Sequence, residues 1–300
     1  MGIPTLHSKI LFYSTTHGVS FERTLTLGRQ NLYTSTKDIH HYLTKFMNVD
    51  LIDEDEFKDN EYSEPLFKNL GASKIDSMDN SSYEGATVLH DLNLPVAEDM
   101  RNQYTVIFDG GTLEHIFNFP IAIKNCMQML RLGGHIISFT PANNQCGHGF
   151  YQFSPELFFR IFSPKNGFDP TLIAMHGGDG SQGSADVYLV KDPDDVKNRI
   201  EFESSKELSL IVVAKKIKEA DLFSEFPQQS DYTSAWSAVK NQSTVSSPVN
   251  VSAFRTLYRE KIPLKIRNRI YGLYHKIRYR KSNYRGFAKV HKEFISKLNF

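Results

Sequence analysis

The chain of 300 residues is 40% hydrophobic and 23% charged, with a net charge of +1, which is ordinary for a soluble globular protein. A chain of this length can bury a substantial core without disulfides, as one large domain or a medium domain with an appendage. No apolar run approaches a membrane span, and Cys126 and Cys146 have neither CxxC nor zinc-ligand spacing, so we expect a reducing, cytoplasmic compartment.

Strand-like and helix-like segments alternate along the first 220 residues. Runs of apolar and β-branched residues predict strands at 23–27, 72–76, 86–91, 104–109, 135–141, 170–175, 185–190 and 208–216. Apolar periodicity and end signals predict helices at 36–47, 62–70, 117–130 and 154–163. This alternation predicts an α/β fold, a Rossmann-like and mostly parallel sheet with helices on both faces.

The composition changes after residue 223 and predicts three regions. Residues 1–223 form the Rossmann-like domain. Residues 224–252 are rich in Ser, Gln and Asn with little periodicity, which predicts a linker or extended segment. Residues 253–300 predict a basic helical C-terminal extension.

The predicted strands end in residues that are typical of a ligand site, namely Gly28, Asp76, Asp91 and Asp109. In an open α/β sheet, ligands bind beyond the carboxyl ends of the strands. An acid after the second strand can accept hydrogen bonds from ribose hydroxyls, and one after the third can reach an adenine amino group. Asp also ends strands because it favours turns, so each residue alone has that simpler explanation.

The stretch "FDGGTLEHIFNFPIAIKNCMQMLRLGGHIISFTP", residues 108–141, resembles the fourth strand, following helix and fifth strand of class I S-adenosylmethionine-dependent methyltransferases. The resemblance extends over roughly residues 20–220 and implies S-adenosylmethionine as cofactor. It places Gly28 and Asp109 near the methionine portion, Asp76 at the ribose, and Asp91 with Leu92 near adenine. The cofactor-binding residues that it implies are Gly28, Arg29, Gln30, Asp76, Asp91, Leu92, Asp109, Gly110, Gly111 and Glu114.

The first-strand loop departs from the family pattern, which has an acid followed by three glycines at alternate positions. Here "LTLGRQNLY" has Thr26 for the acid and keeps only Gly28, with Gln30 and Leu32 at the other glycine positions. Glycines allow close backbone approach. Their loss predicts either that Arg29 or Gln30 contacts the methionine carboxylate, or that cofactor binding is lost.

The methyl-acceptor side is expected after the fifth strand, in "NNQCGHGFYQFSPELFFRIF". A hydroxyl acceptor must lose one proton to a base whose pKa lies near the working pH, and His148 in its glycine-flanked loop is the candidate catalytic base. The alternative is a surface or packing histidine, and His115 in "LEHI" is expected to shape the cofactor wall. Neither histidine has metal-ligand spacing, so no metal site is expected.

The charge is unevenly distributed, because residues 251–300 carry 14 Lys/Arg and two acids for a net charge of +12, against −11 for residues 1–250. Residues 253–300 therefore predict docking onto the acidic body, contact with an anionic membrane surface or membrane-associated assembly, or nucleic-acid binding, of which nucleic acid is least favoured. The first residues lack the basic start of a signal peptide, so we expect a cytoplasmic protein, peripheral at the inner membrane face if the tail binds there.

Two function classes stay open. The first is an active methyltransferase that acts on an oxygen of a sugar, glycan or small metabolite, because Gly-Gly-Thr after Asp109 replaces the Asn/Asp-Pro-Pro-aromatic pattern of enzymes that methylate amino groups of adenine or glutamine. "GHGFYQFSPELF" is also similar to methyltransferase-like proteins of bacterial polysaccharide biosynthesis. The second class is a non-catalytic binding or scaffold protein with the same fold, and a nucleic-acid-directed methyltransferase is a further alternative.

Overall fold

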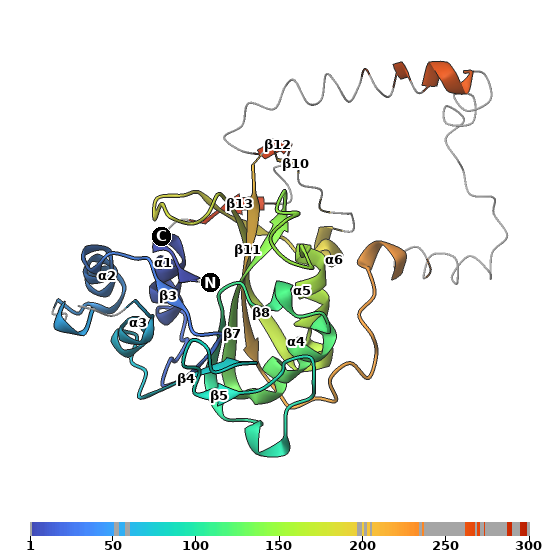
Figure 1. Ribbon diagram of the computed structural model, residues 1–300. Helices are drawn as coiled ribbons and strands as arrows, with labels where there is room; N and C mark the ends of the chain where they lie inside the picture. Colours follow the sequence, from blue (N-terminus) through green and yellow to red (C-terminus); the bar gives the residue numbers. More distant parts are fainter. Residues whose placement is uncertain are drawn as a thin grey trace.

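A nine-stranded sheet forms the centre of the molecule in this computed structural model, and helices cover both of its faces (Figure 1). The order from edge to edge is β13-β9-β8-β11-β7-β6-β2-β4-β5. The structure describes residues 2–50, 54–57, 61–196, 200, 203–204, 206–233, 236, 262–267, 269–270, 273, 287–289 and 295–298.

The strands of this sheet are β2 (Arg23–Leu27), β4 (Lys74–Asp79), β5 (Val88–Leu89), β6 (Tyr104–Asp109), β7 (Leu130–Asn143), β8 (Phe168–Gly177), β9 (Val187–Val190), β11 (Leu208–Lys216) and β13 (Ile295–Lys297). Strands β5, β4, β2, β6 and β7 are parallel neighbours. Strand β11 is antiparallel to both β7 and β8, and β9 is antiparallel to both β8 and β13. The predicted α/β class is confirmed, but the sheet is mixed rather than mostly parallel.

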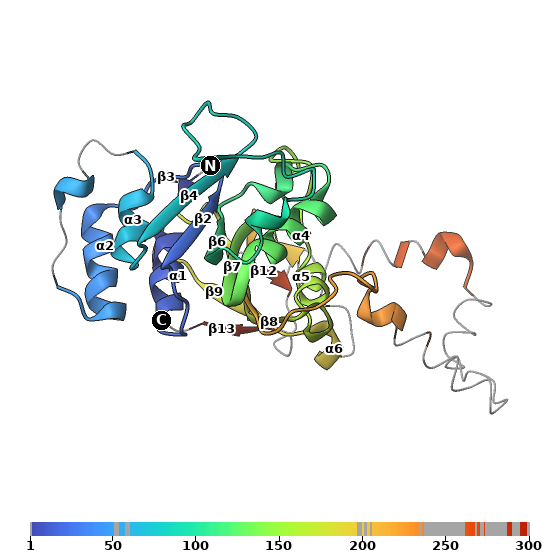
Figure 2. The same ribbon diagram turned by 90° about the horizontal axis from the view of Figure 1, so that it is seen from below.

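The helices separate into two groups. Helices α1 (Thr5–Thr15), α2 (Thr36–Tyr42) and α3 (Glu64–Asn69) lie on one side of the sheet, and α4 (Phe119–Met129) and α5 (Pro155–Ile161) lie on the other (Figure 2). The short helix α6 (Pro193–Val196) follows β9, and β1 (Gly2–Ile3) pairs in parallel with β3 (Asn31–Leu32). The N-terminal segment is thereby tied to the loop after β2.

Each central strand contributes to two hydrophobic clusters because its side chains alternate between the faces of the sheet. In β6, Val106 and Phe108 pack in the cluster beneath α1, while Ile107 packs in the cluster beneath α4. In β7, Ile137 and Ile136 divide in the same way. All five side chains are fully buried. This burial on both faces explains why the strand runs are mostly apolar.

Several predicted boundaries differ from the structure. Strand β4 ends at Asp79, so the prediction that it ends at Asp76 is wrong, and Asp76 lies inside the strand. Tyr104 Oη donates to Asp76 at 3.1 Å and Lys74 Nζ lies 2.9 Å away, and these contacts stabilise an acid in mid-strand. Helix α1 has no counterpart among the predicted elements, and the predicted helix 36–47 ends at Tyr42 in a π-helical turn, Leu43–Met47.

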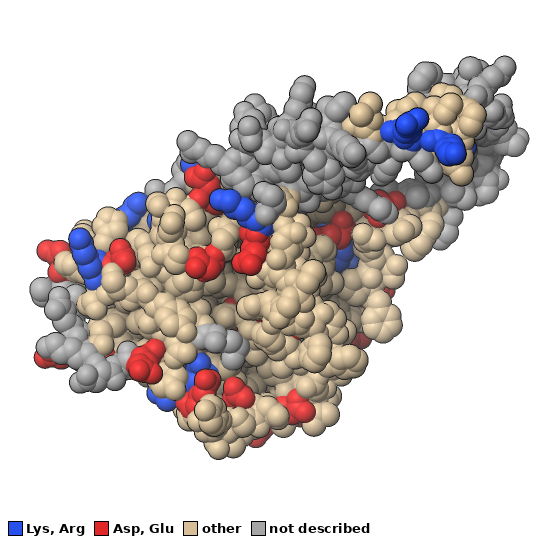
Figure 3. Space-filling view, turned by 45° about the horizontal axis from the view of Figure 1, so that its top comes forward, with Lys and Arg blue, Asp and Glu red and all other residues tan. Residues whose placement is uncertain are grey.

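Most of residues 224–300 lie outside the described residues, so the linker and extension are tested only in part. Strand β13 joins the main sheet, and β12 (Phe287–Lys289) pairs with β10 (Glu203–Ser204), so these pieces are strands rather than the predicted helix. Leu298 packs beside the cluster beneath α1, which agrees with docking of this end onto the body. Leu264, Ile266, Ile270 and Leu273 are exposed, contrary to the packing expected of the tail's apolar side chains. Figure 3 shows acidic side chains spread over the body.

Candidate active site

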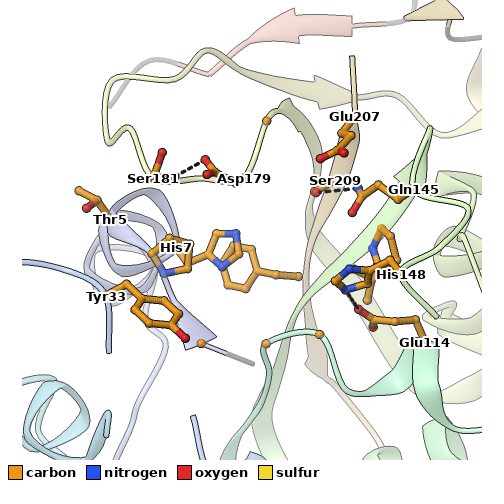
Figure 4. Close-up of a pocket in the computed structure, with 18 of the residues that line it drawn as sticks. Thr5, His7, Tyr33, Glu114, Gln145, His148, Asp179, Ser181, Glu207 and Ser209 are labelled. Atoms are coloured by element: carbon orange, nitrogen blue, oxygen red, sulfur yellow. Dashed lines mark hydrogen bonds and ion pairs between the residues drawn. The ribbon is translucent and has the colours of Figure 1, made fainter. Parts of the chain in front are cut away.

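A cavity of about 600 Å³ lies at the carboxyl ends of β6 and β7. Gly110, Gly111 and Glu114 line it after β6, and Phe139 to Pro141 line it from β7. Thr5 and His7 of α1, with Tyr33, form the opposite wall and face Glu114 and His148 across the space (Figure 4). The cavity therefore occupies the edge where an open α/β sheet binds its ligands.

Asp109 holds the loop that leads into this cavity. Its carboxylate accepts hydrogen bonds from the amides of Thr112 (2.8 Å) and Leu113 (3.3 Å) and from Ser138 Oγ (2.6 Å). Because the side chain is fully buried and these donors occupy it, Asp109 positions the loop and does not face a ligand. Gly111 has φ +98°, a conformation that favours glycine.

Gly110, the first glycine of the Asp-Gly-Gly sequence, lies where a side chain would not fit. A Cβ atom added there would lie 2.6 Å from Gln30 Oε1, so the backbone after β6 and the side chain after β2 are in close contact. Gln30 is fully buried, and its Nε2 donates to the Leu27 carbonyl oxygen at 2.6 Å. Its Oε1 is buried without a hydrogen-bond donor. The side chain at this family glycine position thus presents an unused acceptor beside Gly110.

Glu114 and His148 meet on the cavity wall. His148 Nε2 lies 3.2 Å from Glu114 Oε1, and the side chain of Glu114 is 1% exposed whereas that of His148 is 50% exposed. The approach lacks hydrogen-bond alignment, so both carboxylate oxygens stay without a donor. Burial, together with the neighbouring Asp109 carboxylate, raises the pKa of Glu114 to about 8. His115 lies beside His148, with 5.4 Å between the ring centroids.

Backbone hydrogen bonds place the His148 loop over Glu114. The amides of Phe150 and Tyr151 both donate to the Glu114 carbonyl oxygen, at 2.9 and 3.2 Å. A Cβ atom on Gly149 would lie 3.0 Å from that carbonyl oxygen, so the glycine allows this close approach. Two segments 34 residues apart in sequence are thereby fixed together at the cavity.

The region beside α1 also holds polar atoms without partners. His7 stacks on Phe139 with 3.8 Å between ring centroids, and His176 lies edge-on to His7 at 5.7 Å. The ring nitrogens of both histidines and the Thr140 hydroxyl are buried without hydrogen-bond partners in the protein. Burial lowers the pKa of His7 and lowers that of His176 to about 4. Buried polar groups in native proteins are nearly always paired, and His7 and Thr140 line the cavity, so their atoms point to a polar ligand there.

The cavity brings together four of the predicted cofactor-binding and catalytic residues, Gly110, Gly111, Glu114 and His148, and His115, the predicted wall residue, also lines it. The other predicted residues do not line it: Gly28, Arg29, Gln30, Asp76, Asp91, Leu92 and Asp109. His7, Tyr33, Thr140, Asp179 and Glu207 line it without having been predicted, and the unassigned segment 1–22 held no motif that could have identified His7.

Two predicted cofactor residues have other partners. Arg29 Nε donates to Glu64 Oε1 at 2.7 Å, and its guanidinium lies over the Tyr62 ring. Asp91 accepts from the amide and side chain of Asn93, and these hydrogen bonds lower its pKa. We conclude that Glu64 and Tyr62 hold the Arg29 guanidinium and that Asp91 shapes the turn after β5.

The carboxyl ends of β2 and β4 lie side by side. Gly28 donates its amide to the Met78 carbonyl oxygen at 2.7 Å, which places the β2 loop beside Asp79 at the end of β4. Asp79 is therefore the acid at the carboxyl end of β4, whereas Asp76 lies inside the strand. The orphaned Gln30 Oε1 is suited to accept from the ammonium of the cofactor's amino-acid end.

Comparison with known proteins gives a likeness of fold. No protein family and no curated protein matches the sequence. Similar solved structures include the N-methyltransferase NodS from Bradyrhizobium japonicum in complex with S-adenosyl-L-homocysteine, at 10% identity over 72% of this chain and 89% of that chain, TM-score 0.35. The structural neighbours have the fold of class I S-adenosylmethionine-dependent methyltransferases.

Two further solved structures are similar at comparable values. The MccD protein is 13% identical over 70% of this chain and 96% of that chain, with a TM-score of 0.39. The C9 mutein of the branched-chain polyamine synthase from Thermus thermophilus, solved with N4-aminopropylspermidine and 5'-methylthioadenosine, is 13% identical over 72% of this chain, with a TM-score of 0.37. The chain spans 57% of the length of that synthase. At these identities and TM-scores the likeness shows a shared fold and does not indicate a function.

Proposed function

We propose that the protein is an S-adenosylmethionine-dependent methyltransferase that acts on an oxygen of a sugar, glycan or small metabolite bound in the cavity. The observation that supports this most directly is the set of buried, partnerless polar atoms that extends from Gln30 Oε1 through Glu114 to Thr140 and His7. This set joins the predicted cofactor position at Gly110 to the cavity that would hold the acceptor.

The lining of the cavity suits a neutral, hydroxyl-bearing acceptor. It contains the acids Glu114, Asp179 and Glu207 and three histidines, and no Lys or Arg among its described residues. An anionic acceptor, such as a nucleotide-linked sugar with its phosphates in the cavity, would meet unfavourable charge there. Ser209 and Tyr33 add hydroxyl groups of the kind that hydrogen-bond to sugars.

The protein's own groups would bind and orient the two substrates. S-adenosylmethionine supplies a methyl group on a sulfonium, and transfer requires an acceptor oxygen in line with it. Gly28, Asp79 and Gln30 would hold the ribose and amino-acid portions of the cofactor. His148, next to Glu114 and half-exposed to the cavity, would contact the acceptor oxygen. Thr140 and His7 would fix the rest of the acceptor.

A non-catalytic binding protein is the second candidate. Gln30 fills the space beside Gly110 that a glycine would leave open, and Arg29 is engaged by Glu64. If these side chains exclude the cofactor, the cavity binds a small polar ligand without methyl transfer.

Methyl transfer from labelled S-adenosylmethionine to a panel of monosaccharides and small hydroxylated metabolites tests the proposal. We expect label in at least one acceptor with wild-type protein, a large loss with His148→Ala, and unchanged transfer with His17→Ala, an exposed histidine in the turn after α1. Binding of S-adenosylhomocysteine without transfer to any acceptor would favour the binding protein.

A further inference from the structure

Three side chains with metal-binding atoms meet on the cavity wall after β6. Glu114, His115 and His148 each offer one ligand atom, and these atoms lie within 4.8 Å of one another. We propose that they bind a divalent transition-metal ion of the zinc type. Sequence spacing gives no hint of this site, because the first two residues are adjacent and the third comes from a separate loop.

The Glu114 carboxylate supplies the strongest reason for a cation here. The residue is 0% exposed, and neither carboxylate oxygen receives a hydrogen bond. A buried carboxylate without hydrogen-bond donors is costly to ionise, and a cation bound between it and His148 would offset that cost. His148 Nε2 approaches Oε1 at 3.2 Å without hydrogen-bond alignment, which leaves both atoms available to a shared ion.

The three ligands are held in place before any ion arrives. Glu114 and His115 belong to the 3₁₀ turn Leu113–His115, whose approach is fixed by the hydrogen bonds of Asp109. His148 is brought to them by the Phe150 and Tyr151 amides, which bond to the Glu114 carbonyl oxygen. Backbone contacts therefore set the site, so that only small side-chain movements are needed to close it around an ion.

The ligand set indicates the kind of metal. Two imidazoles and one carboxylate form the set that binds catalytic zinc and non-haem iron, whereas Mg²⁺ prefers oxygen ligands alone. Asp179 and Glu207 add negative charge to the same cavity, and its described lining holds no Lys or Arg to repel a cation. Three protein ligands leave coordination positions free on the cavity side.

This assignment deepens the proposed function without depending on it. An acceptor hydroxyl bound at a free position would lose its proton more readily, because a bound metal lowers the pKa of an oxygen that it coordinates. His148 would then act as a ligand, and direct proton removal by its imidazole would not be required. Metal binding itself requires neither cofactor nor acceptor.

Calorimetric titration of chelator-treated, full-length protein with ZnCl₂, without S-adenosylmethionine, tests the site. We expect saturable binding of one Zn²⁺ that millimolar Mg²⁺ does not displace. Glu114→Gln, His115→Ala and His148→Ala should each weaken it by more than about 10-fold, because losing a residue that merely orients a ligand already costs about 10- to 100-fold. His17→Ala, a remote and exposed histidine, should leave the affinity unchanged.

A spectroscopic readout keeps the test decisive if Glu114→Gln does not fold. Co²⁺ in place of Zn²⁺ should give visible absorption bands that change with His148→Ala, a substitution at a half-exposed side chain. Absence of saturable Zn²⁺ binding, displacement by Mg²⁺, or binding and Co²⁺ spectra that none of the three substitutions alters would overturn the proposal. Since no cofactor is present, such a failure would leave the methyltransferase proposal to its own test.

Discussion

Replacing Gln30 by methionine should separate a cofactor contact from an obstruction. Methionine has a similar volume, so the space beside Gly110 stays filled while the amide is lost. If Gln30 Oε1 accepts from the ammonium of the cofactor, its loss should cost about 1.5–3 kcal/mol, the range for a hydrogen bond to a charged group. This corresponds to roughly 10- to 150-fold weaker binding of S-adenosylhomocysteine.

The same substitution should change stability little. It removes the hydrogen bond from Nε2 to the Leu27 carbonyl oxygen, worth about 1 kcal/mol, but Thr112 Oγ1 still donates to that oxygen at 2.7 Å. It also removes a buried acceptor without a donor, which offsets part of the loss. We therefore expect a change in unfolding free energy within about 1 kcal/mol.

Calorimetry with S-adenosylhomocysteine, beside a thermal melt, measures both effects. Gln228→Met on an exposed segment controls for the substitution itself and should leave binding unchanged. A Gln30→Met protein that binds as tightly as wild type, or more tightly, would refute the contact.

Three other perturbations test the site, the core and the tail. Asp79→Asn should weaken S-adenosylhomocysteine binding by about 1.5–3 kcal/mol, and an unchanged affinity by calorimetry would remove Asp79 from the ribose site. The pKa of His176 is about 4 in the fold against its ordinary value of 6.5, so between these values the unfolded chain binds more protons and stability falls as the pH is lowered, by about 1.4 kcal/mol per unit. Denaturant unfolding at pH 6.5 and 4.5 should show a smaller drop for His176→Leu than for wild type, and equal drops would contradict this protonation. The exposed Leu264, Ile266 and Ile270 alternate with Lys265, Arg267 and Arg269, so we propose that this segment contacts an anionic membrane surface. Vesicles of acidic lipid should bind the protein at low salt and release it at salt concentrations above about 0.5 M. Salt-independent binding, or no binding, would exclude this contact. Among the described residues, no helix is both long enough and apolar enough to cross a membrane.

Strand ends were predicted correctly where local sequence sets them and wrongly where a contact with a distant residue sets them. Strands 104–109 and 208–216 have the predicted ends, because their mostly apolar runs are buried on both faces. Strand β4 runs past Asp76 because Tyr104, distant in sequence, supplies a hydrogen-bond donor. Such a tertiary contact leaves no local signal, and Asp looks like a turn residue when read alone.

In the candidate site, local sequence likewise identified single residues, whereas tertiary contacts decide which residues meet. His148 was found because a histidine between glycines suggests a functional loop. Its pairing with Glu114 depends on the Phe150 amide reaching the Glu114 carbonyl oxygen, which no spacing rule predicts. The wall formed by His7 depends on helix α1, and the packing of that helix beside β7 is set by the whole sheet.

Titration of the wild-type protein with S-adenosyl-L-homocysteine tests the central claim most directly. We predict saturable binding at one site, and a ligand concentration about a hundredfold above Kd should stabilise the fold by roughly 2.7 kcal/mol. Absence of both binding heat and a shift in melting temperature at millimolar ligand would contradict the account and leave the fold as a scaffold for a different ligand.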